Sequence, residues 1–346
     1  MRLGMLLRYS GAPSGPELQQ ILEAERLGYD SVWSSEAYGT DAVTPAAWVL
    51  ARTTRIKVGT GIMQIQARTP ACCAMTAMTL QALSNNRFML GIGTSGPQVV
   101  EGWHGAPFDR PLARMREYVE IIRKILKREA PLEHHGEIYQ IPYTGPGATG
   151  LGKPLKSILH AEANLPIYTA SITPAGLRTS GEIADGALPI FMSPEKAKVV
   201  TEPLLEGMRK AGGGKSLADF AIAPYVRIRM GDDLKACRDA LKPEIALYVG
   251  GMGARGKNFY NDFVKRLGYE EAAVRIQDAY LSGRRDEAIA AVPDQLVDEM
   301  SLVGSAARIK DRLQAWKAAA KSNEVRSILL GGATVESLRV VAEAVL

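Results

Sequence analysis

The chain has 346 residues, of which 46% are hydrophobic and 23% are charged, and its net charge at neutral pH is +5. This apolar share is ample for a large core, yet no apolar run is long enough to cross a bilayer, so we expect no membrane partner. The basic balance comes without a basic helix or an aromatic platform, which argues against a nucleic-acid partner and suits an anionic small ligand.

Cysteine and histidine usage narrows the classes further. Three cysteines cannot build a disulfide framework, and four histidines show no metal-ligand spacing. The N-terminus becomes polar too soon for a signal peptide. We therefore expect a cytoplasmic protein without a metal ion.

Strands and helices alternate regularly over the first 92 residues. Short apolar or β-branched runs predict strands at 2–7, 31–34, 56–60 and 88–92, with a loop at 11–15 after the first. Amphipathic or apolar segments predict helices at 16–27, 44–52 and 70–83. Thr69 and Pro70 form a helix start at the last of these. This order is typical of a parallel α/β sheet.

The alternation loosens after residue 103 and then resumes. A helix is predicted at 111–127, a hairpin at 132–143 and a Gly/Pro-rich surface loop or lid at 144–154, which together make an insertion at about 103–160. Further strands are predicted at 166–170, 184–191, 220–230 and 327–330, with a second insertion at about 250–303. We expect one domain over 1–346, a TIM barrel of the (β/α)8 type with insertions after strands 4 and 7. A doubly wound sheet is the alternative, but the eight repeats and the lack of a dinucleotide fingerprint after the first strand favour the barrel.

In such a barrel the loops after the strands form the catalytic face, so candidates are chosen by position. His104 is a candidate proton donor, and Glu36 is either a site residue or an exposed loop carboxylate. The glycines of GIGTSG (91–96) form either a phosphate cradle or an ordinary turn. Each remaining candidate also has a plain structural interpretation, as a core or capping residue. These others follow strands two to seven: Tyr38, Met63, Gln64, Trp103, Ser171, Thr173, Phe191, Arg227 and Arg229.

Four segments carry a family resemblance when they are taken together. They are GTGIMQIQ (59–66), GIGTSG (91–96), YTASITPAGLR (168–178) and GGMGARGKNFYN (250–261). The chain resembles the luciferase-like monooxygenase superfamily, and most of all its actinobacterial branch of oxidoreductases that use the deazaflavin coenzyme F420. The resemblance covers nearly the whole chain. It implies a barrel, commonly a homodimer, with the cofactor ring at the carboxyl ends of the strands.

The resemblance also implies a set of site residues. A non-proline cis peptide would support the ring from behind, here between Gly61 and Ile62, with Glu36 beside the cofactor. The substrate would lie over the ring in a pocket walled by Met63, Trp103 and Phe191. The cofactor's phosphate would contact the turns after strands four and five, at Gly93, Thr94, Ser95, Gly96, Ala170, Ser171, Ile172 and Thr173.

The sequence departs from the family's sugar-phosphate and alcohol dehydrogenases at two places. Their Ser-Asp-His motif after strand two is replaced by Ser35, Glu36 and Ala37, and Gly96 stands where they carry an acid. The proton-transfer group is therefore unassigned, and our candidates are Glu36, Tyr38 and His104, in that order.

The expected function is hydride exchange between coenzyme F420 and a small or medium organic substrate, such as a carbonyl compound or an activated alkene. An FMN-dependent monooxygenase and a deazaflavin-binding protein without turnover are the alternatives. The tail of the deazaflavin is strongly anionic, and four basic residues of the second insertion would either bind it or form a solvated surface. They are Arg255, Lys257, Arg284 and Arg285.

Overall fold

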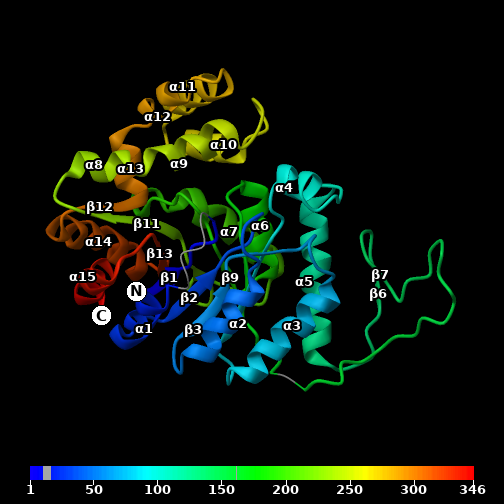
Figure 1. Cartoon of the computed structure of the whole chain (residues 1–346). Helices are drawn as coiled ribbons and strands as arrows, with labels where there is room; N and C mark the ends of the chain where they lie inside the picture. The colour runs from blue at the N-terminus through cyan, green and yellow to red at the C-terminus, as the bar shows by residue number, and fades with distance from the viewer. Residues whose placement is uncertain (11–16, 161) are drawn as a thin grey trace.

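The computed structural model describes residues 1–10, 17–160 and 162–346 (Figure 1). The predicted loop at 11–15 lies outside the described residues. The strands of the main sheet are β1 (Arg2–Leu6), β2 (Ser31–Ser34), β3 (Lys57–Thr60), β4 (Met63–Gln64), β5 (Phe88–Gly93), β8 (Ile167–Thr169), β9 (Gly186–Ala187), β10 (Ala221–Ile222), β11 (Tyr225–Met230), β12 (Ser301–Gly304) and β13 (Ser327–Gly331).

These strands pair in parallel and curl into the predicted barrel. The path runs from β9 through β8, β5, β3, β2 and β1 to β13. β10 pairs with β9, and β11 pairs with β13. Because only Ala223 and Pro224 separate β10 from β11, this segment joins the two ends of the path. The amide of Tyr225 donates to the carbonyl of Pro189, and the amide of Leu329 donates to that of Pro224, which completes the seam. The expectation of a (β/α)8 barrel is confirmed.

Aromatic rings fill the interior of the barrel, and glycines on neighbouring strands make room for them. The indole of Trp33 is 1% exposed and meets the ring of Tyr168 edge-on at 5.1 Å. A Cβ atom on Gly59 would lie 2.4 Å from the Trp33 ring, and one on Gly186 would lie 2.4 Å from the Tyr168 ring. The interior is therefore a packed core, and any ligand must bind above it.

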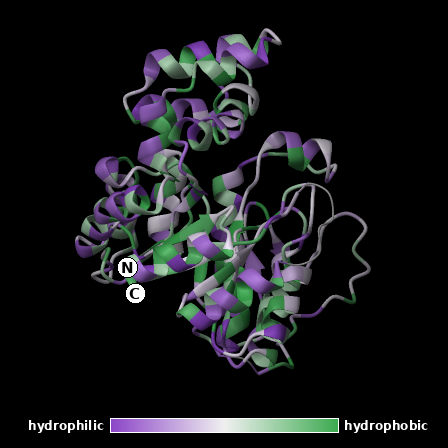
Figure 2. Ribbon diagram, turned by 60° about the vertical axis from the view of Figure 1, so that its left-hand side comes forward, coloured by the Kyte–Doolittle hydropathy of each residue, from purple (hydrophilic) through white to green (hydrophobic). Residues whose placement is uncertain are grey.

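Helices pack around the sheet with their apolar faces inward (Figure 2). Thr69 and Thr173 cap two of them through side-chain oxygens that accept the amide protons of Cys72 and Gly176. The outer helices are α1 (Leu18–Leu27), α2 (Val43–Arg52), α3 (Pro70–Leu83), α5 (Pro111–Lys127), α6 (Pro174–Ile183), α7 (Lys198–Ala211), α14 (Ala306–Lys321) and α15 (Val335–Val345), with a short turn η1 (Pro194–Lys196).

The two insertions differ in form. The first contains the predicted hairpin, β6 (His134–His135) and β7 (Gln140–Ile141), and extends outward beyond α5 (Figure 1). The second is helical and stands over one end of the barrel, at the top of Figure 1. Its elements are α8 (Leu234–Asp239), α9 (Lys242–Ala246), η2 (Leu247–Gly251), α10 (Phe259–Arg266), α11 (Glu270–Leu281), α12 (Arg285–Ala290) and α13 (Asp294–Met300).

Three expectations need correction. The strand expected at 220–230 is interrupted between β10 and β11, where Ala223 and Pro224 leave the regular ladder. The insertion expected at about 250–303 begins earlier, at α8, and ends at α13, because α8 directly follows β11 and β12 pairs with β11 in the sheet. The turn after β5 contains a helix, α4 (Pro97–Gly102), that the sequence patterns did not predict. Among the described residues, no helix has both the length and the apolar character needed to cross a bilayer.

Replacing Gly59 with alanine tests the packing of the barrel interior. The new methyl group would meet the Trp33 indole, which is held by a hydrogen bond from its Nε1 to Ser31 Oγ. We expect the free energy of unfolding to fall by about 1–3 kcal/mol, as for other overpacked cores. Urea denaturation measures the loss. Gly102→Ala is the control, since a Cβ atom there meets nothing within 4 Å; an equal loss in both variants would contradict the packing argument.

Candidate functional site

The segment after β3 forms a bulge at the carboxyl end of the barrel. The peptide bond between Gly61 and Ile62 is cis, as the resemblance implies, and both residues are partly exposed. The amide of Gly61 donates to the carbonyl of Ser34 at 2.6 Å. A Cβ atom on Gly93 would lie 3.0 Å from the Ile62 side chain, so Ile62 packs closely against the end of β5. The bulge therefore presents a partly exposed apolar surface at the carboxyl end of the barrel, which we call the mouth.

Met63 differs from its expected place as a pocket wall. Its side chain is only 1% exposed, and its sulfur lies 3.9 Å from the Sγ atom of Cys73 in the core beneath the bulge. The expectation for Met63 as a substrate contact is therefore wrong, because the side chain points away from the mouth.

The turns after β5 and β8 present free amide groups side by side. β5 and β8 are neighbours in the sheet, so both turns leave the same edge. Ser95 has a left-handed backbone with φ of 56°. In the described part of the chain, the amide nitrogens of residues 94–96 and 171–173 are bonded to no backbone carbonyl. Such groups are the donors that bind phosphate and other anions.

Glu36 lies at this end of the barrel, but in an ion pair. Its Oε1 and Oε2 atoms accept the two Nη groups of Arg68 at 2.8 and 2.9 Å. They also accept the amides of Gln64 and Ala42 at 3.1 and 3.0 Å. Burial alone raises the pKa of Glu36, but these four hydrogen bonds outweigh it and hold the pKa below its usual range.

This geometry corrects the role expected of Glu36 as a proton donor. Every acceptor position of the carboxylate is used, and the group is held ionised. The side chain is 7% exposed. Glu36 instead joins the loop after β2 to the bulge after β3. Arg68, its partner, is a residue that the sequence patterns missed.

Tyr38 and Trp103 lie together on the surface. Each is 66% exposed, and their ring centroids are 6.4 Å apart. Tyr38 comes from the loop after β2, and Trp103 caps α4. The neighbouring His104 is half-buried, and its Nε2 atom is enclosed without a hydrogen-bond partner in the described part of the chain. These three residues share one side of the mouth, as their positions in loops two and four predict.

Phe191 belongs to an aromatic cluster that the second insertion completes. It is 7% exposed, with φ of 61°, and its ring meets Tyr248 and Tyr260 at 5.6 and 6.0 Å. Burial raises the pKa of Tyr260 to about 12. Phe191 therefore has little exposed surface, and the cluster ties the insertion to the segment after β9. Phe191 also lines a narrow pocket between β11 and α9.

The second insertion also contacts the side of the mouth where the turns after β5 and β8 lie. Arg266 of α10 donates to the carbonyl of Ile172 at 2.6 Å. Gln98 of α4 donates to the carbonyl of Met252 at 3.2 Å. These contacts position the helical insertion over the turns after β5 and β8.

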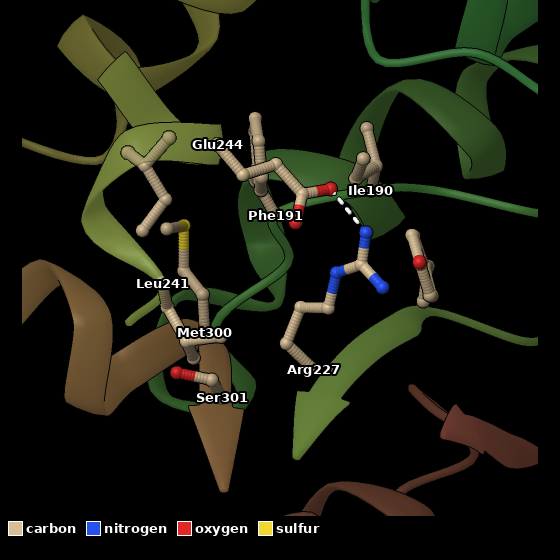
Figure 3. A pocket seen from close by; sticks show the side chains of 9 residues that line it. Ile190, Phe191, Arg227, Leu241, Glu244, Met300 and Ser301 are labelled. Carbon is tan, nitrogen blue, oxygen red and sulfur yellow. Dashed lines mark hydrogen bonds and ion pairs between the residues drawn. The ribbon is translucent and has the colours of Figure 1, made fainter. Parts of the chain in front are cut away.

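A cavity with a volume of about 450 Å³ lies at the carboxyl ends of β1 and β13, beside Tyr225 and Arg227 in the first half of β11. A second, narrow pocket lies beside it, between β11 and α9 (Figure 3). Tyr225 and Arg227 border both. Arg227 ion-pairs there with Glu244 across the narrow pocket.

Comparison with known proteins shows which group this chain belongs to. The sequence profile of the luciferase-like monooxygenases matches residues 1–322. The chain belongs to the luciferase-like monooxygenase family. A Mycobacterium tuberculosis protein named provisionally as a coenzyme F420-dependent oxidoreductase is 44% identical to this luciferase-like chain over 321 residues, which are 92% of each chain. The predicted family and the prediction of an enzyme are confirmed.

More distant relatives share the fold of this luciferase-like enzyme. The 5,10-methylenetetrahydromethanopterin reductase of Archaeoglobus fulgidus is 27% identical over 93% of this chain and 92% of its own. The coenzyme F420-dependent tetrahydromethanopterin reductase of Methanopyrus kandleri superposes with a TM-score of 0.79, covering 99% of this chain and 98% of its own, at 22% identity. An FMN complex of a Pseudomonas putida Baeyer-Villiger monooxygenase superposes with a TM-score of 0.64 at 19% identity, covering 100% and 97%.

Within the described ranges, no three His, Cys, Asp or Glu side chains come together as a metal site requires. Absence of a metal from the reaction stays a prediction.

Replacing Arg68 with glutamine tests the ion pair beneath the mouth. Because Arg68 is 19% exposed, we expect the free energy of unfolding at pH 7 to fall by about 2–3 kcal/mol, at the low end for a buried pair. The lowered pKa of Glu36 stabilises the fold above pH 4.5, its ordinary value, and this stabilisation is lost as the pH falls towards the lowered value. The difference in the free energy of unfolding between the wild-type protein and R68Q should therefore become smaller below pH 4.5.

Urea denaturation across this pH range measures the effect. Arg284→Gln is the matched control, because its partner is Glu287 and both side chains are more than half exposed. The control should change stability by less than about 1 kcal/mol. A loss in R68Q that is equally small, or that does not narrow in acid, would contradict the role given to the pair.

Proposed function

We propose that this luciferase-like enzyme is a coenzyme F420-dependent oxidoreductase that exchanges a hydride with a small or medium organic substrate, such as a carbonyl compound or an activated alkene. The M. tuberculosis relative supports this proposal through its name and its 44% identity over most of both chains. The observation on the chain itself that carries the proposal is the cradle formed by the bulge and the two turns. The bulge offers a partly exposed apolar surface, and the turns offer amide donors.

The residues fit the parts of a deazaflavin nucleotide in kind. The ring would rest on the partly exposed segment Gly61–Ile62. The phosphate would take the free amides of Thr94, Ser95 and Gly96 and of residues 171–173. Gly93 ends β5, and Ala170 directly follows β8 and donates its amide to the carbonyl of Ile92 at 3.0 Å. When bound, the coenzyme supplies the carbon that gives or takes the hydride.

The residues of the chain would orient the coenzyme and substrate and move a proton. Glu36 contributes by fixing the loop after β2, so that Tyr38 and Trp103 keep their place beside the mouth. Of the three expected proton donors, Tyr38 and His104 remain candidates. The Nε2 atom of His104 is enclosed and has no hydrogen-bond partner among the described residues. Trp103, with its exposed ring, remains a candidate substrate wall.

The tail of the coenzyme finds less support on the second insertion. Arg255 is ion-paired with Asp278 at 2.8 Å, and Arg284 with Glu287 at 2.6 Å. Lys257 and Arg285 are exposed. We therefore propose that the basic residues of this surface attract the tail at long range without forming a specific site for it.

FMN is the second candidate cofactor. The P. putida monooxygenase binds it on the same fold, and one phosphate would also fit the amide cradle. A deazaflavin-binding protein without turnover remains the third alternative. A single domain over 1–346, a homodimer and a cytoplasmic location stay predictions from the sequence. Exposed Leu151, Leu155 and Ile158 on the first insertion support a homodimer, since they are 78–96% exposed and would gain by contact with a second copy.

A titration of the purified protein with oxidised coenzyme F420, and separately with FMN, tests the proposal by fluorescence. We expect micromolar or tighter binding of the deazaflavin and weaker binding of FMN, followed by oxidation of the reduced coenzyme in a screen of carbonyl and alkene substrates. A preference for FMN would favour the monooxygenase instead. Binding without any turnover would favour the third alternative.

Replacing Gly93 with alanine tests the cradle. The new methyl group would lie 3.0 Å from the Ile62 side chain, which borders the space assigned to the ring, so Ile62 must shift. We expect F420 to bind about tenfold more weakly, equivalent to about 1.4 kcal/mol, with a smaller change in stability because Ile62 is partly exposed. Fluorescence titration and urea denaturation measure the two effects. Gly102→Ala serves again as control and should bind as the wild-type protein does; equal affinities in all three proteins would contradict the placement of the ring.

A further inference from the structure

The 450 Å³ cavity lies across the barrel from the amide cradle. It is bordered by the carboxyl ends of β1 and β13 and by Tyr225 and Arg227 of β11. In the order of strands around the barrel, β13 and β1 stand opposite β5 and β8, whose turns form the cradle. The cavity therefore lies apart from the amide groups of the turns after β5 and β8. Its volume is in the range of small-molecule sites.

Arg227 is the charged side chain between this cavity and the narrow pocket of Figure 3. Its side chain is 33% exposed, and its guanidinium lies 4.8 Å above the ring of Tyr225. One of its terminal nitrogens donates to Glu244 of α9 at 2.5 Å. The stacked ring and the ion pair hold the guanidinium in a defined orientation.

Arg227 has donor capacity that the protein does not use. A guanidinium has five N–H donors, and in the described part of the chain only one nitrogen of Arg227 has an acceptor. Its Nε atom is enclosed without a partner. A half-buried cation with free donors at the wall of a polar cavity is suited to a carboxylate, which accepts two parallel N–H groups.

Tyr9 lines the same cavity, as do Arg8 and Glu17, whose charges have opposite signs. Its carbonyl accepts the amide of Thr40 at 3.0 Å, which ties it to the loop after β2. The Tyr9 side chain lies next to that of Tyr248. Tyr9 and Arg227 are far apart in the sequence, and only the closure of the barrel brings them to one cavity.

We propose that this cavity binds the carboxylate of a small organic molecule through Arg227, and that this molecule is the substrate of the hydride transfer. The assignment of this molecule as the substrate rests on the proposed function, whereas the existence of a carboxylate-binding site does not. The same chemistry could come from the acidic tail of the coenzyme. The position opposite the cradle favours the substrate, and the test separates the two sources.

Calorimetric titration of the full chain without cofactor is the test, with benzoate as the probe and neutral benzamide of the same shape as its match. We expect benzoate to bind and benzamide to bind at least about tenfold more weakly, as expected for the loss of a charged hydrogen-bonded pair. Arg227→Gln should weaken benzoate by a similar factor. Arg229→Gln is the control: Arg229 lies two residues further along β11, is exposed and does not border the cavity.

Glu244→Gln is a second variant, and we expect it to strengthen benzoate binding where Arg227→Gln weakens it. Glutamine keeps an oxygen that can accept from Arg227 but removes the competing negative charge. Benzoate should therefore bind several-fold more tightly, which a merely structural role for the pair would not produce. Equal binding of benzoate and benzamide, no binding of benzoate, or unchanged affinity in Arg227→Gln would each overturn the proposal. If Arg227→Gln does not fold, as judged by circular dichroism, Glu244→Gln decides alone, and unchanged or weaker binding would overturn it.

Repeating the benzoate titration with coenzyme F420 at saturation identifies the source of the carboxylate. Benzoate that still binds with undiminished affinity supports the substrate assignment. Benzoate that is displaced by F420, but not by the deazaflavin ring without its tail, overturns that assignment in favour of the tail. Arg227-dependent binding of benzoate by a protein that binds no F420 would leave the site standing while the proposed function fails.

Discussion

The packing of aromatic rings against glycines inside the barrel is the constraint on which the site depends. Trp33, Tyr168 and Tyr225 fill the interior, and a Cβ atom on Gly59, Gly186 or Gly331 would lie about 2.4 Å from one of these rings. Because parallel strands all end at one edge, this filled interior becomes the floor of everything built above it. Tyr225 connects the interior with the site above it. Its ring packs against Gly331 of β13, and the guanidinium of Arg227 stacks over the same ring.

The loops above that floor gain their order from buried charge. The Glu36 carboxylate accepts hydrogen bonds from Arg68 and from the amides of Ala42 and Gln64, which joins the loop after β2 to the bulge after β3 and to Arg68. This carboxylate is then not free for chemistry. In the proposed function the coenzyme carries the difficult chemistry, which suits a site whose carboxylate is not free for proton transfer. The residues of the chain would then provide orientation, and the free amides after β5 and β8 carry no charge of their own.

The sequence could predict the elements and the edge where the site lies, but not the direction of individual side chains. Glycine at the ends of the strands at 56–60 and 88–92, and Thr173 with Pro174, mark the turns correctly because their backbone requirements are local. Met63 was misplaced because a bulge sets which side of the chain faces the core. Glu36 was misread because its partner is 32 residues away, and that pairing exists only once β2 and β3 adjoin. β12 was missed because SLVG is too short to stand out from the helices around it.

The second insertion connects these observations. Its contacts reach both sides of the mouth: Arg266 binds the turn after β8, and Glu244 binds Arg227 of β11. Such contacts make the insertion a cover whose position depends on the same residues that face the ligands. Amide donors with no charge lie on one side and a guanidinium on the other, so the two sides differ in what they can recognise. In the proposed function, the uncharged side would hold the coenzyme, which is common to all reactions, whereas the charged side would distinguish one substrate from another.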